Sequence, residues 1–341
     1  MKILISGING FIGPKTAKAF LDKGDSVRGL ILKGSDESSL NNLNIEKIYA
    51  DITDISMLHK AVSGIDTIIH LAAILGDTGP DEKYHATNYE GTVNLCSAAI
   101  EAGVKRIVFL SSLSVHGLSK NKGFNDADEE TPVDPDTAYS RSKAKCENYL
   151  HDLSKSGKIE TVIVRPAWTI FGSDDRLVSA KLLTSIKAKR FAYINGGNAK
   201  HGFVHVESLA DSIVNIARAE SSVVDGEKFV ISDYYLTWKE FTEIVCDKFN
   251  VSYPKINAPL WVVKIFASVY EPVVKFINPQ KDPIISKYRI LIPSQNICFK
   301  YDKAKNLINH IPKYTFNEAL DSTIEWYNNE YADLEKAVKI L

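Results

Sequence analysis

The sequence predicts an α/β protein in which a parallel sheet carries helices on both faces, followed by a smaller, helix-rich part. Two observations support this fold class. Short runs rich in aliphatic and β-branched residues alternate with helical stretches over the first 112 residues, which is the pattern of a parallel sheet with crossover helices. A glycine-rich turn also follows the first of these runs directly and opens the first helical stretch.

The expected elements of the first part lie close together along the chain. Strands are expected at 2–6, 26–32, 47–51, 66–73 and 105–112, and helices at 14–24, 56–64 and 87–103. The helical stretches end at or near a glycine or a charged residue, as helices commonly do. After about residue 160 the pattern loosens, and the remaining expected elements are strands at 161–172 and 228–233 and a strand end with a helix at 203–219.

The composition is that of an ordinary globular protein, with 45% hydrophobic and 24% charged residues and a formal net charge of -1. No basic block stands out, so we expect a small-molecule partner and not a nucleic acid. The four cysteines lie far apart without a CxxC pair or a histidine cluster, so we expect no metal site and no disulfide framework. The strand-like run at the start leaves no room for a signal peptide, and we therefore expect a cytoplasmic protein.

One apolar stretch, 260–277, is interrupted by Lys264, Glu271 and Lys275 and contains Pro272. It is too charged to span a bilayer. Two interpretations stay open: a helix or helix pair packed over a pocket, which we favour, or contact with a membrane interface.

The glycine-rich turn predicts a dinucleotide site on a Rossmann, doubly wound sheet. In this motif one glycine forms the tight turn, one lets the backbone approach the pyrophosphate, and one permits close packing of helix on strand. The residues expected at the cofactor here are Gly7, Asn9, Gly10, Phe11, Ile12 and Gly13. We expect 1–165 to be mainly the NAD(P)-binding domain and 166–341 mainly a substrate lobe, with some of its segments returning to the first domain.

The end of the second expected strand bears on the choice between NAD and NADP. An acid about 20 residues past the motif normally holds the ribose hydroxyls of NAD, whereas the run here is Leu30-Ile31-Leu32-Lys33-Gly34-Ser35. Lys33 with Ser35 would suit the 2′-phosphate of NADP, but Lys33 is equally explained as a solvated surface lysine. The sequence leans only slightly toward NADP.

Tyr139 and Lys143 are the candidate acid/base pair. Their spacing of four puts both side chains on one face of a helix. A phenol titrates near pH 10 and is a poor base at neutrality, but a neighbouring ammonium together with an oxidised nicotinamide favours the phenolate. Ser112 ends an apolar strand, where doubly wound folds bind ligands, and its hydroxyl can hydrogen-bond a reacting oxygen.

Together these segments resemble the extended short-chain dehydrogenase/reductase family, of the NAD-dependent epimerase/dehydratase type, over most of the chain. Beyond the glycine motif, Tyr139, Lys143 and Ser112, the matching segments are Asp51-Ile52, Ile69-His70-Leu71-Ala72-Ala73, Asn88-Tyr89-Glu90-Gly91-Thr92, Arg165-Pro166 through Gly172, and His205-Val206-Glu207-Ser208-Leu209-Ala210.

The resemblance implies a division of labour. Tyr139 would exchange a proton with the substrate oxygen, Lys143 would bind the nicotinamide ribose and lower the pKa of the tyrosine, and Ser112 would orient the oxygen. Asn88 joins this catalytic group by the same resemblance. Further cofactor contacts are implied at Asp51, Ile52, Leu71, Ala72, Ala73 and Pro166.

Two reactions compete: hydride transfer at a secondary alcohol or ketone, and 4-epimerisation of a nucleoside-diphosphate sugar. The run Asn198-Ala199-Lys200-His201-Gly202-Phe203 lacks the arginine that usually holds the diphosphate, and Leu113-Ser114 replaces the Asp-Glu of the 4,6-dehydratases. The C-terminal part looks more like the 3β-hydroxysteroid dehydrogenase and dihydroflavonol reductase branch. We therefore favour the oxidoreductase. A non-catalytic protein that senses NAD(P) is a third, less favoured interpretation, because Tyr139 and Lys143 are both present.

Four residues are candidates for substrate contact: Ser114, His116, Trp168 and His201. Packing would explain His116 and Trp168 equally well. By analogy with the family we also expect a homodimer, formed through the helix that carries Tyr139 and the one after the Asn88 motif. The apolar residues available to such a bundle are Leu95, Cys96, Ala98, Ala99, Cys146, Tyr149 and Leu150.

Overall fold

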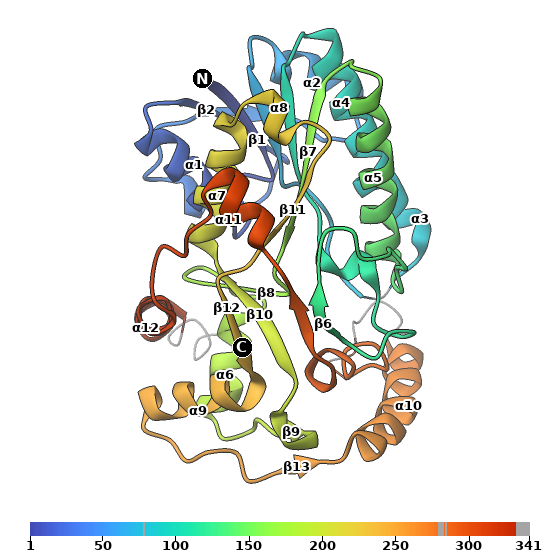
Figure 1. Cartoon of the computed structure of the whole chain (residues 1–341), viewed down its shortest axis with the longest axis vertical. Coiled ribbons are helices and arrows are strands. Elements are labelled where there is room, and N and C mark those ends of the chain that lie inside the picture. Colours follow the sequence, from blue (N-terminus) through green and yellow to red (C-terminus); the bar gives the residue numbers. More distant parts are fainter. Residues whose placement is uncertain (78, 279–282, 284, 332–341) are drawn as a thin grey trace.

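The computed structural model describes residues 1–77, 79–278, 283 and 285–331. Its chain forms two parts, the upper and lower halves of Figure 1: a large sheet between layers of helices, and a smaller part built on a second sheet. The N-terminus lies in the upper part, where the first strand begins.

The large sheet confirms the predicted fold class. Its strands run from edge to edge in the order β11-β7-β5-β4-β1-β2-β3, and every neighbouring pair is parallel. Their bounds are β1 (Lys2–Ser6), β2 (Ser26–Ile31), β3 (Glu46–Tyr49), β4 (Thr67–His70), β5 (Arg106–Leu110), β7 (Glu160–Pro166) and β11 (Lys228–Ile231). The chain order reverses between β1 and β4, and ligands of doubly wound sheets bind at the carboxyl ends of such strands.

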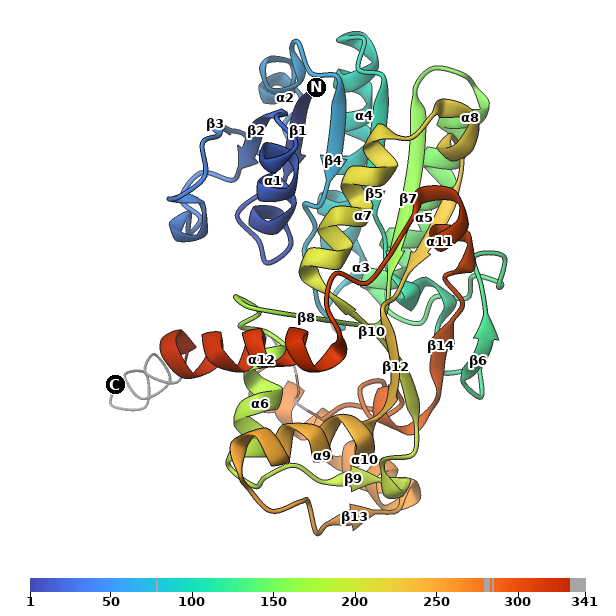
Figure 2. The ribbon, with the colours of Figure 1, turned by 60° about the vertical axis from the view of Figure 1, so that its left-hand side comes forward.

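Helices cover both faces of this sheet (Figure 2). One face holds α1 (Gly13–Asp22), α7 (Val206–Arg218), α8 (Ser221–Val224) and α11 (Asp302–Ile308), and the other holds α2 (Ile55–Val62), α4 (Gly91–Glu101) and α5 (Ala138–Lys155). Side chains of β1 alternate between the two faces: Ile3 and Ile5 pack with α1 and α7, and Leu4 packs with α2 and α4. Burial on both faces explains why this strand is a continuous apolar run.

The smaller part contains a second sheet in the order β12-β10-β14-β6, with β8 also paired to β10. Its strands are β6 (Phe124–Ala127), β8 (Thr169–Phe171), β10 (Lys200–His205), β12 (Tyr234–Thr237) and β14 (Ile297–Phe299), and a separate ribbon pairs β9 (Tyr193–Ile194) with β13 (Asn257–Ala258). Its helices are α6 (Ser179–Lys187), α9 (Trp238–Phe249), α10 (Leu260–Ile277) and α12 (Phe316–Trp326). Shorter helical turns are α3 (Asp81–Tyr84), η1 (Ser38–Leu40), η2 (His85–Glu90), η3 (Leu113–His116), η4 (Asn195–Gly197), η5 (Ile292–Ser294) and η6 (Tyr327–Tyr331).

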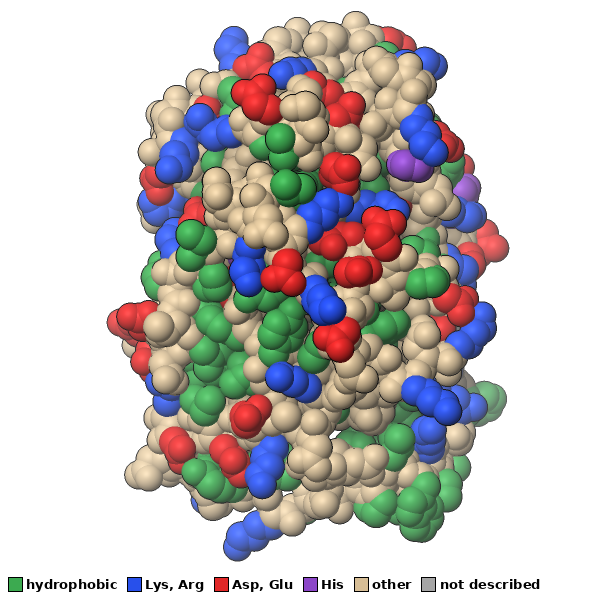
Figure 3. Space-filling view, in the orientation of Figure 1, with side chains coloured by type: hydrophobic (Ala, Val, Ile, Leu, Met, Phe, Trp, Pro, Cys, Tyr) green, Lys and Arg blue, Asp and Glu red, His purple; other side chains and the backbone are tan. Residues whose placement is uncertain are grey.

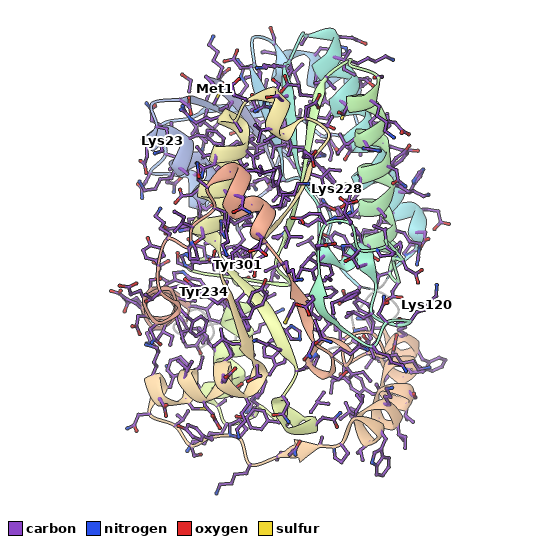
Figure 4. The ribbon with its side chains drawn as sticks, viewed as in Figure 1. Met1, Lys23, Lys120, Lys228, Tyr234 and Tyr301 are labelled. Atoms are coloured by element: carbon purple, nitrogen blue, oxygen red, sulfur yellow. The ribbon has the colours of Figure 1, made fainter. Side chains whose placement is uncertain are left out.

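The chain crosses between the two parts more than once. Figure 4 marks one crossing: Lys228 begins β11 of the large sheet and Tyr234 begins β12 of the second sheet. The stretch 161–172, expected as one strand, is another crossing. It divides into β7, which ends in the large sheet at Pro166, and β8, which pairs with β10 in the second sheet.

The apolar stretch 260–277 forms one helix, α10, that continues through Pro272. It does not pack over a pocket as we favoured: none of its residues lines the large cavity of the described structure, and Ala267 is its only buried residue. Within the described ranges, no helix is long and apolar enough to cross a membrane.

Candidate active site

The turn after β1 needs its glycines for steric reasons. Gly7 has φ +68°, and a Cβ on it would lie 2.8 Å from the Cα of Ala72. A Cβ on Gly13 would lie 2.2 Å from the carbonyl oxygen of Ile8, within the same loop. Helix α1 begins at Gly13, and no side chain caps its first turn, so its N-terminal N–H groups suit a phosphate. The turn therefore fits a dinucleotide pyrophosphate.

A cavity of about 890 Å³ opens at the carboxyl ends of the strands of the large sheet. Most of the predicted site residues line this cavity. They are Gly7, Asn9, Gly10, Phe11, Ile12, Gly13, Asp51, Ile52, Leu71, Ala72, Ala73, Ser112, Ser114, Tyr139, Lys143, Pro166 and Trp168. Four predicted residues, Lys33, Asn88, His116 and His201, are not part of its lining.

At the end of β2 the cavity is lined by Leu32 and Ser35, while Lys33 is exposed and is not part of the lining. The Asn9 amide donates to the Ser35 hydroxyl at 2.9 Å and to the Asp36 carbonyl at 2.9 Å, which ties this loop to the glycine turn. The Asp36 carboxylate accepts from the Ser38 N–H, and this bond holds its pKa below the ordinary value.

Tyr139 and Lys143 lie in the first two turns of α5. A capping box between Thr137 and Ser140 sets the start of this helix. The Lys143 ammonium donates to the Leu110 carbonyl at 2.7 Å and lies 4.4 Å from the centre of the Phe109 ring. It therefore sits against the end of β5.

Burial shifts the pKa values of both groups. Desolvation lowers the pKa of Lys143 to about 8, with its side chain almost entirely enclosed. Desolvation also raises the pKa of Tyr139, and a hydrogen bond with Ser112 opposes that rise. The phenol is therefore neutral at physiological pH unless further positive charge comes close.

Ser112 follows β5 in an extended conformation, and its hydroxyl accepts from the Ser114 N–H at 3.1 Å. This bond turns the chain into η3 and holds both serines on the cavity wall. The Ser112 hydroxyl also hydrogen-bonds Tyr139, so its hydrogen can serve the tyrosine or a reacting oxygen.

Asn88 is buried behind the site. Its side-chain oxygen accepts from the Ile74 N–H at 2.9 Å, and its amide donates to the Ile74 carbonyl at 3.2 Å and to the Ser142 hydroxyl at 3.0 Å. Ser142 in turn donates to the Tyr139 carbonyl at 2.7 Å. Asn88 thus joins the loop after β4 to the first turn of α5, which makes it a positioning residue in this structure.

His116 and His201 are packing residues and not cavity walls. His116 is fully buried, contacts the Pro132 carbonyl at 3.0 Å and lies 3.2 Å from Arg165, and burial lowers its pKa to about 4. His201 is also fully buried, with Nε2 2.8 Å from the Ile292 carbonyl, and burial lowers its pKa to about 4 as well. We expected both histidines near a substrate because of their positions in the sequence. Sequence position alone does not show whether a side chain of a short element faces the cavity or the core.

The cavity also has walls that the sequence did not single out. Asp77, Leu177 and Val178 line it from loops, and Tyr288 and Ile292 line it from the segment after α10. The phenol of Tyr288 is held in an apolar setting that raises its pKa, and Asp77 adds to that rise. No motif marks these positions. Asp77 lies in the loop after β4, and the other four reach the cavity through the placement of the smaller part.

A comparison of the amino-acid sequence with protein families identifies the family of this chain. Residues 3–232 match the model of the NAD dependent epimerase/dehydratase family. The chain belongs to this family. The predicted resemblance to the extended short-chain dehydrogenases is thereby confirmed, as is the prediction of an NAD(P)-dependent enzyme.

Curated relatives of this family member include oxidoreductases. The chain is 23% identical over 325 residues to 4-hydroxy-2-methyl-3-oxo-4-farnesyl-3,4-dihydroquinoline-1-oxide ketoreductase of Stigmatella aurantiaca, covering 94% of this chain and 95% of the relative. It is 27% identical over 310 residues to 3beta-hydroxysteroid-dehydrogenase/decarboxylase isoform 2 of Arabidopsis thaliana, covering 86% of this chain but only 54% of that longer protein.

Among solved structures, UDP-glucose 4-epimerase of Thermotoga maritima, determined with UDP-glucose, has a TM-score of 0.76 and 20% identity. The match covers 96% of this chain and 99% of the epimerase. At this identity it establishes the shared fold of the family and leaves the reaction open.

Proposed function

We propose that the protein is an NAD(P)-dependent oxidoreductase that transfers hydride at a secondary alcohol or ketone. One observation supports this most directly: Tyr139, Lys143 and Ser112 line the same cavity as the glycine turn. The proton-transfer groups thus stand at the nicotinamide end expected for a dinucleotide whose pyrophosphate lies at Gly7 and Gly13.

Each side chain has a distinct role in this proposal. The dinucleotide, when bound, supplies or accepts the hydride. Tyr139 exchanges the proton of the substrate oxygen, and Ser112 donates a hydrogen bond to that oxygen. The Lys143 ammonium, 6.0 Å from the centre of the Tyr139 ring, favours the phenolate and is placed to bind the ribose hydroxyls.

The charge of the cavity wall favours a neutral, largely apolar substrate. Among the described lining residues Lys143 is the sole Lys or Arg, whereas Asp51, Asp77 and Asp175 are carboxylates. A nucleoside diphosphate carries negative charges that proteins usually meet with Arg or Lys. The apolar part of the lining instead suits a hydrocarbon substrate. It consists of Leu75, Trp168, Ile170, Leu177, Val178 and Ile292. The names of the ketoreductase and hydroxysteroid dehydrogenase relatives agree with this.

Two measurements test the proposal. The Tyr139→Phe variant should lose turnover by roughly a hundredfold or more, because it lacks the hydroxyl that exchanges the proton. Its affinity for reduced nicotinamide should stay within about twofold, because the glycine turn is unchanged. Absorbance of reduced nicotinamide should change when apolar keto or hydroxy compounds are added. Interconversion of UDP-sugars without net change in the cofactor would instead establish the epimerase, and normal turnover of Tyr139→Phe would refute the roles assigned here.

We also infer a slight preference for NADP over NAD. Among the described residues no carboxylate from the end of β2 lines the cavity, and the Ser35 hydroxyl does. Lys33, two residues earlier, is exposed, and its ammonium has the charge that suits a 2′-phosphate. The Lys33→Ala variant should then weaken NADPH binding about tenfold, or ~1.4 kcal/mol, and leave NADH binding unchanged. Lys60→Ala, at an exposed position of α2, is the control, and equal effects on both cofactors would refute the preference.

A homodimer through α4 and α5 and a cytoplasmic location stay predictions. Most of the apolar residues expected at the dimer interface are instead buried in the subunit's own core. These are Leu95, Cys96, Ala98, Ala99, Cys146 and Leu150. Of the side chains we expected there, Tyr149 alone stays partly exposed, so any interface on this face would use the outer edges of the two helices.

A further inference from the structure

Helix α10 carries its large apolar side chains in solvent. Trp261 is 66% exposed, Ile265 60% and Phe276 89%. The remaining members, each at least 39% exposed, are Val262, Phe266, Val269, Val273 and Ile277. These eight residues, here called the α10 apolar face, contribute to the hydrophobic side chains gathered at the lower right of Figure 3, where Figure 1 places the helix.

The α10 apolar face is one continuous stripe. Successive helical residues turn by about 100°, so its members cover nearly half of the helix circumference. Ala267, the buried residue, lies on the opposite side. Lys264 and Lys275 are both exposed and follow one edge of the stripe. A broad exposed apolar stripe with lysines at its margin and aromatic residues within it is typical of helices that lie in a membrane interface.

The charge around α10 differs from that of the whole chain. The described residues from 255 to 289 contain five Lys or Arg and one Glu, a formal charge of +4 (5 minus 1), whereas the chain carries -1. Arg289 is paired with Asp77 at 2.6 Å, and Lys255, Lys264 and Lys287 are exposed. Glu271 is already paired with Lys275 at 2.8 Å. A locally basic surface around an apolar stripe complements anionic lipid headgroups above acyl chains.

We propose that the α10 apolar face docks on the surface of an anionic lipid bilayer, with the helix lying in the interface and Lys264 and Lys275 at the headgroups. The helix has 18 residues, of which three are charged, so it is suited to lie along the surface and not to cross it.

Docking would bring the cavity wall close to the bilayer. Glu271 accepts from the Lys287 N–H at 2.9 Å, which holds Lys287 against the helix. The next residue, Tyr288, lines the cavity. If the proposed function holds, an apolar substrate would reach the cavity from the membrane, but the docking itself does not depend on that function.

Cosedimentation of the full chain with vesicles tests the docking. Wild-type protein should bind vesicles of equal parts phosphatidylcholine and phosphatidylglycerol more tightly than vesicles of phosphatidylcholine alone. The Ile265→Glu/Phe276→Glu variant should bind the anionic vesicles at least about tenfold more weakly, since both side chains are exposed and would enter the acyl region. The Ile311→Glu variant is the matched control, because Ile311 is 75% exposed outside α10.

Two further readouts separate the outcomes. Brominated lipids should quench tryptophan fluorescence of the wild type and lose most of that effect in Trp261→Phe. Lys264→Glu/Lys275→Glu should weaken binding to the anionic vesicles and leave binding to neutral vesicles little changed. No vesicle binding by wild type, or equal binding by the Ile265→Glu/Phe276→Glu variant, overturns the proposal. A dimer that this variant dissociates, with no vesicle binding by wild type, assigns the face to a second copy instead.

Discussion

Helices α5 and α10 have the same length, 18 residues each. They differ in how the polarity of their residues relates to the burial of those residues. Helix α5 is rich in polar residues, yet Ser142, Lys143 and Glu147 are buried among its core contacts. Helix α10 is mostly apolar, yet Ala267 alone is buried. The comparison teaches that the surroundings of a helix, and not its hydrophobicity, decide which of its side chains leave water. Helix α5 packs on one face of the large sheet, and its first turns line the cavity, whereas α10 lies at the periphery of the smaller part (Figure 1).

The buried polar side of α5 is held by an ion pair. Glu147 accepts from Arg165 of β7 at 2.9 and 2.5 Å and from the Ser111 hydroxyl at 2.5 Å. Arg165 is fully buried and Glu147 nearly so. These bonds lock α5 onto the ends of β5 and β7, one turn beyond Lys143.

The largest expected effect therefore follows removal of this carboxylate. Glu147→Ala should lower the free energy of unfolding by about 3–5 kcal/mol, because Arg165 would remain as a buried, unpaired charge. Urea unfolding followed by circular dichroism measures this. Asn148→Ala, at an exposed position of the same helix, should change stability by less than about 0.5 kcal/mol. Equal stability of the two variants would mean that the ion pair does not hold α5.

A smaller and pH-dependent effect is expected at Lys143, whose pKa burial lowers from 10.5 to about 8. Below pH 8 the lysine is charged in both the folded and unfolded states, and the folded state bears the desolvation cost. Between pH 8 and 10.5 the unfolded state binds more protons, so wild-type stability gains from this group as pH rises. Lys143→Met should therefore be more stable than wild type by on the order of 2 kcal/mol at pH 7, and inactive, with the stability difference shrinking toward pH 10.

Unfolding curves at pH 7 and pH 10 measure this difference. Lys145→Met, two residues along the same helix and exposed, serves as the control and should show no such pH dependence. A constant difference between Lys143→Met and wild type over this range would show that the ammonium is not desolvated as the structure indicates.

The smallest effect is expected on the exposed side of α10, and the buried position of the same helix provides the contrast. Ala267→Asp should cost about 2 kcal/mol, because it places a carboxylate at the one buried position. Ile265→Ser should change the free energy of unfolding by less than about 0.5 kcal/mol, since its side chain is 60% exposed. Thermal unfolding of the two variants checks this. A large loss of stability in Ile265→Ser would mean that another surface covers α10 in solution.

Much of the site was predictable from local sequence. The glycine turn could be recognised from the sequence because Gly7 and Gly13 have no room for a Cβ. Any other residue at these positions would clash with the backbone. The helical spacing of Tyr139 and Lys143 also predicted correctly that they share one helix face, and both line the cavity. Lys33, His116 and His201 were less predictable, because each lies near the site in sequence while its side chain turns into solvent or into the core.

The sequence by itself determined the alternation of strands and helices, the glycine turn and the shared helix face of Tyr139 and Lys143, because these depend on residue type and on spacing within single elements. Only the tertiary structure decided that Tyr288 joins the cavity and that the apolar side of α10 stays in water. Both outcomes depend on how the smaller part is placed against the large sheet. That placement follows from contacts between residues more than a hundred positions apart, such as the 2.6 Å ion pair of Arg289 with Asp77, which no local pattern records.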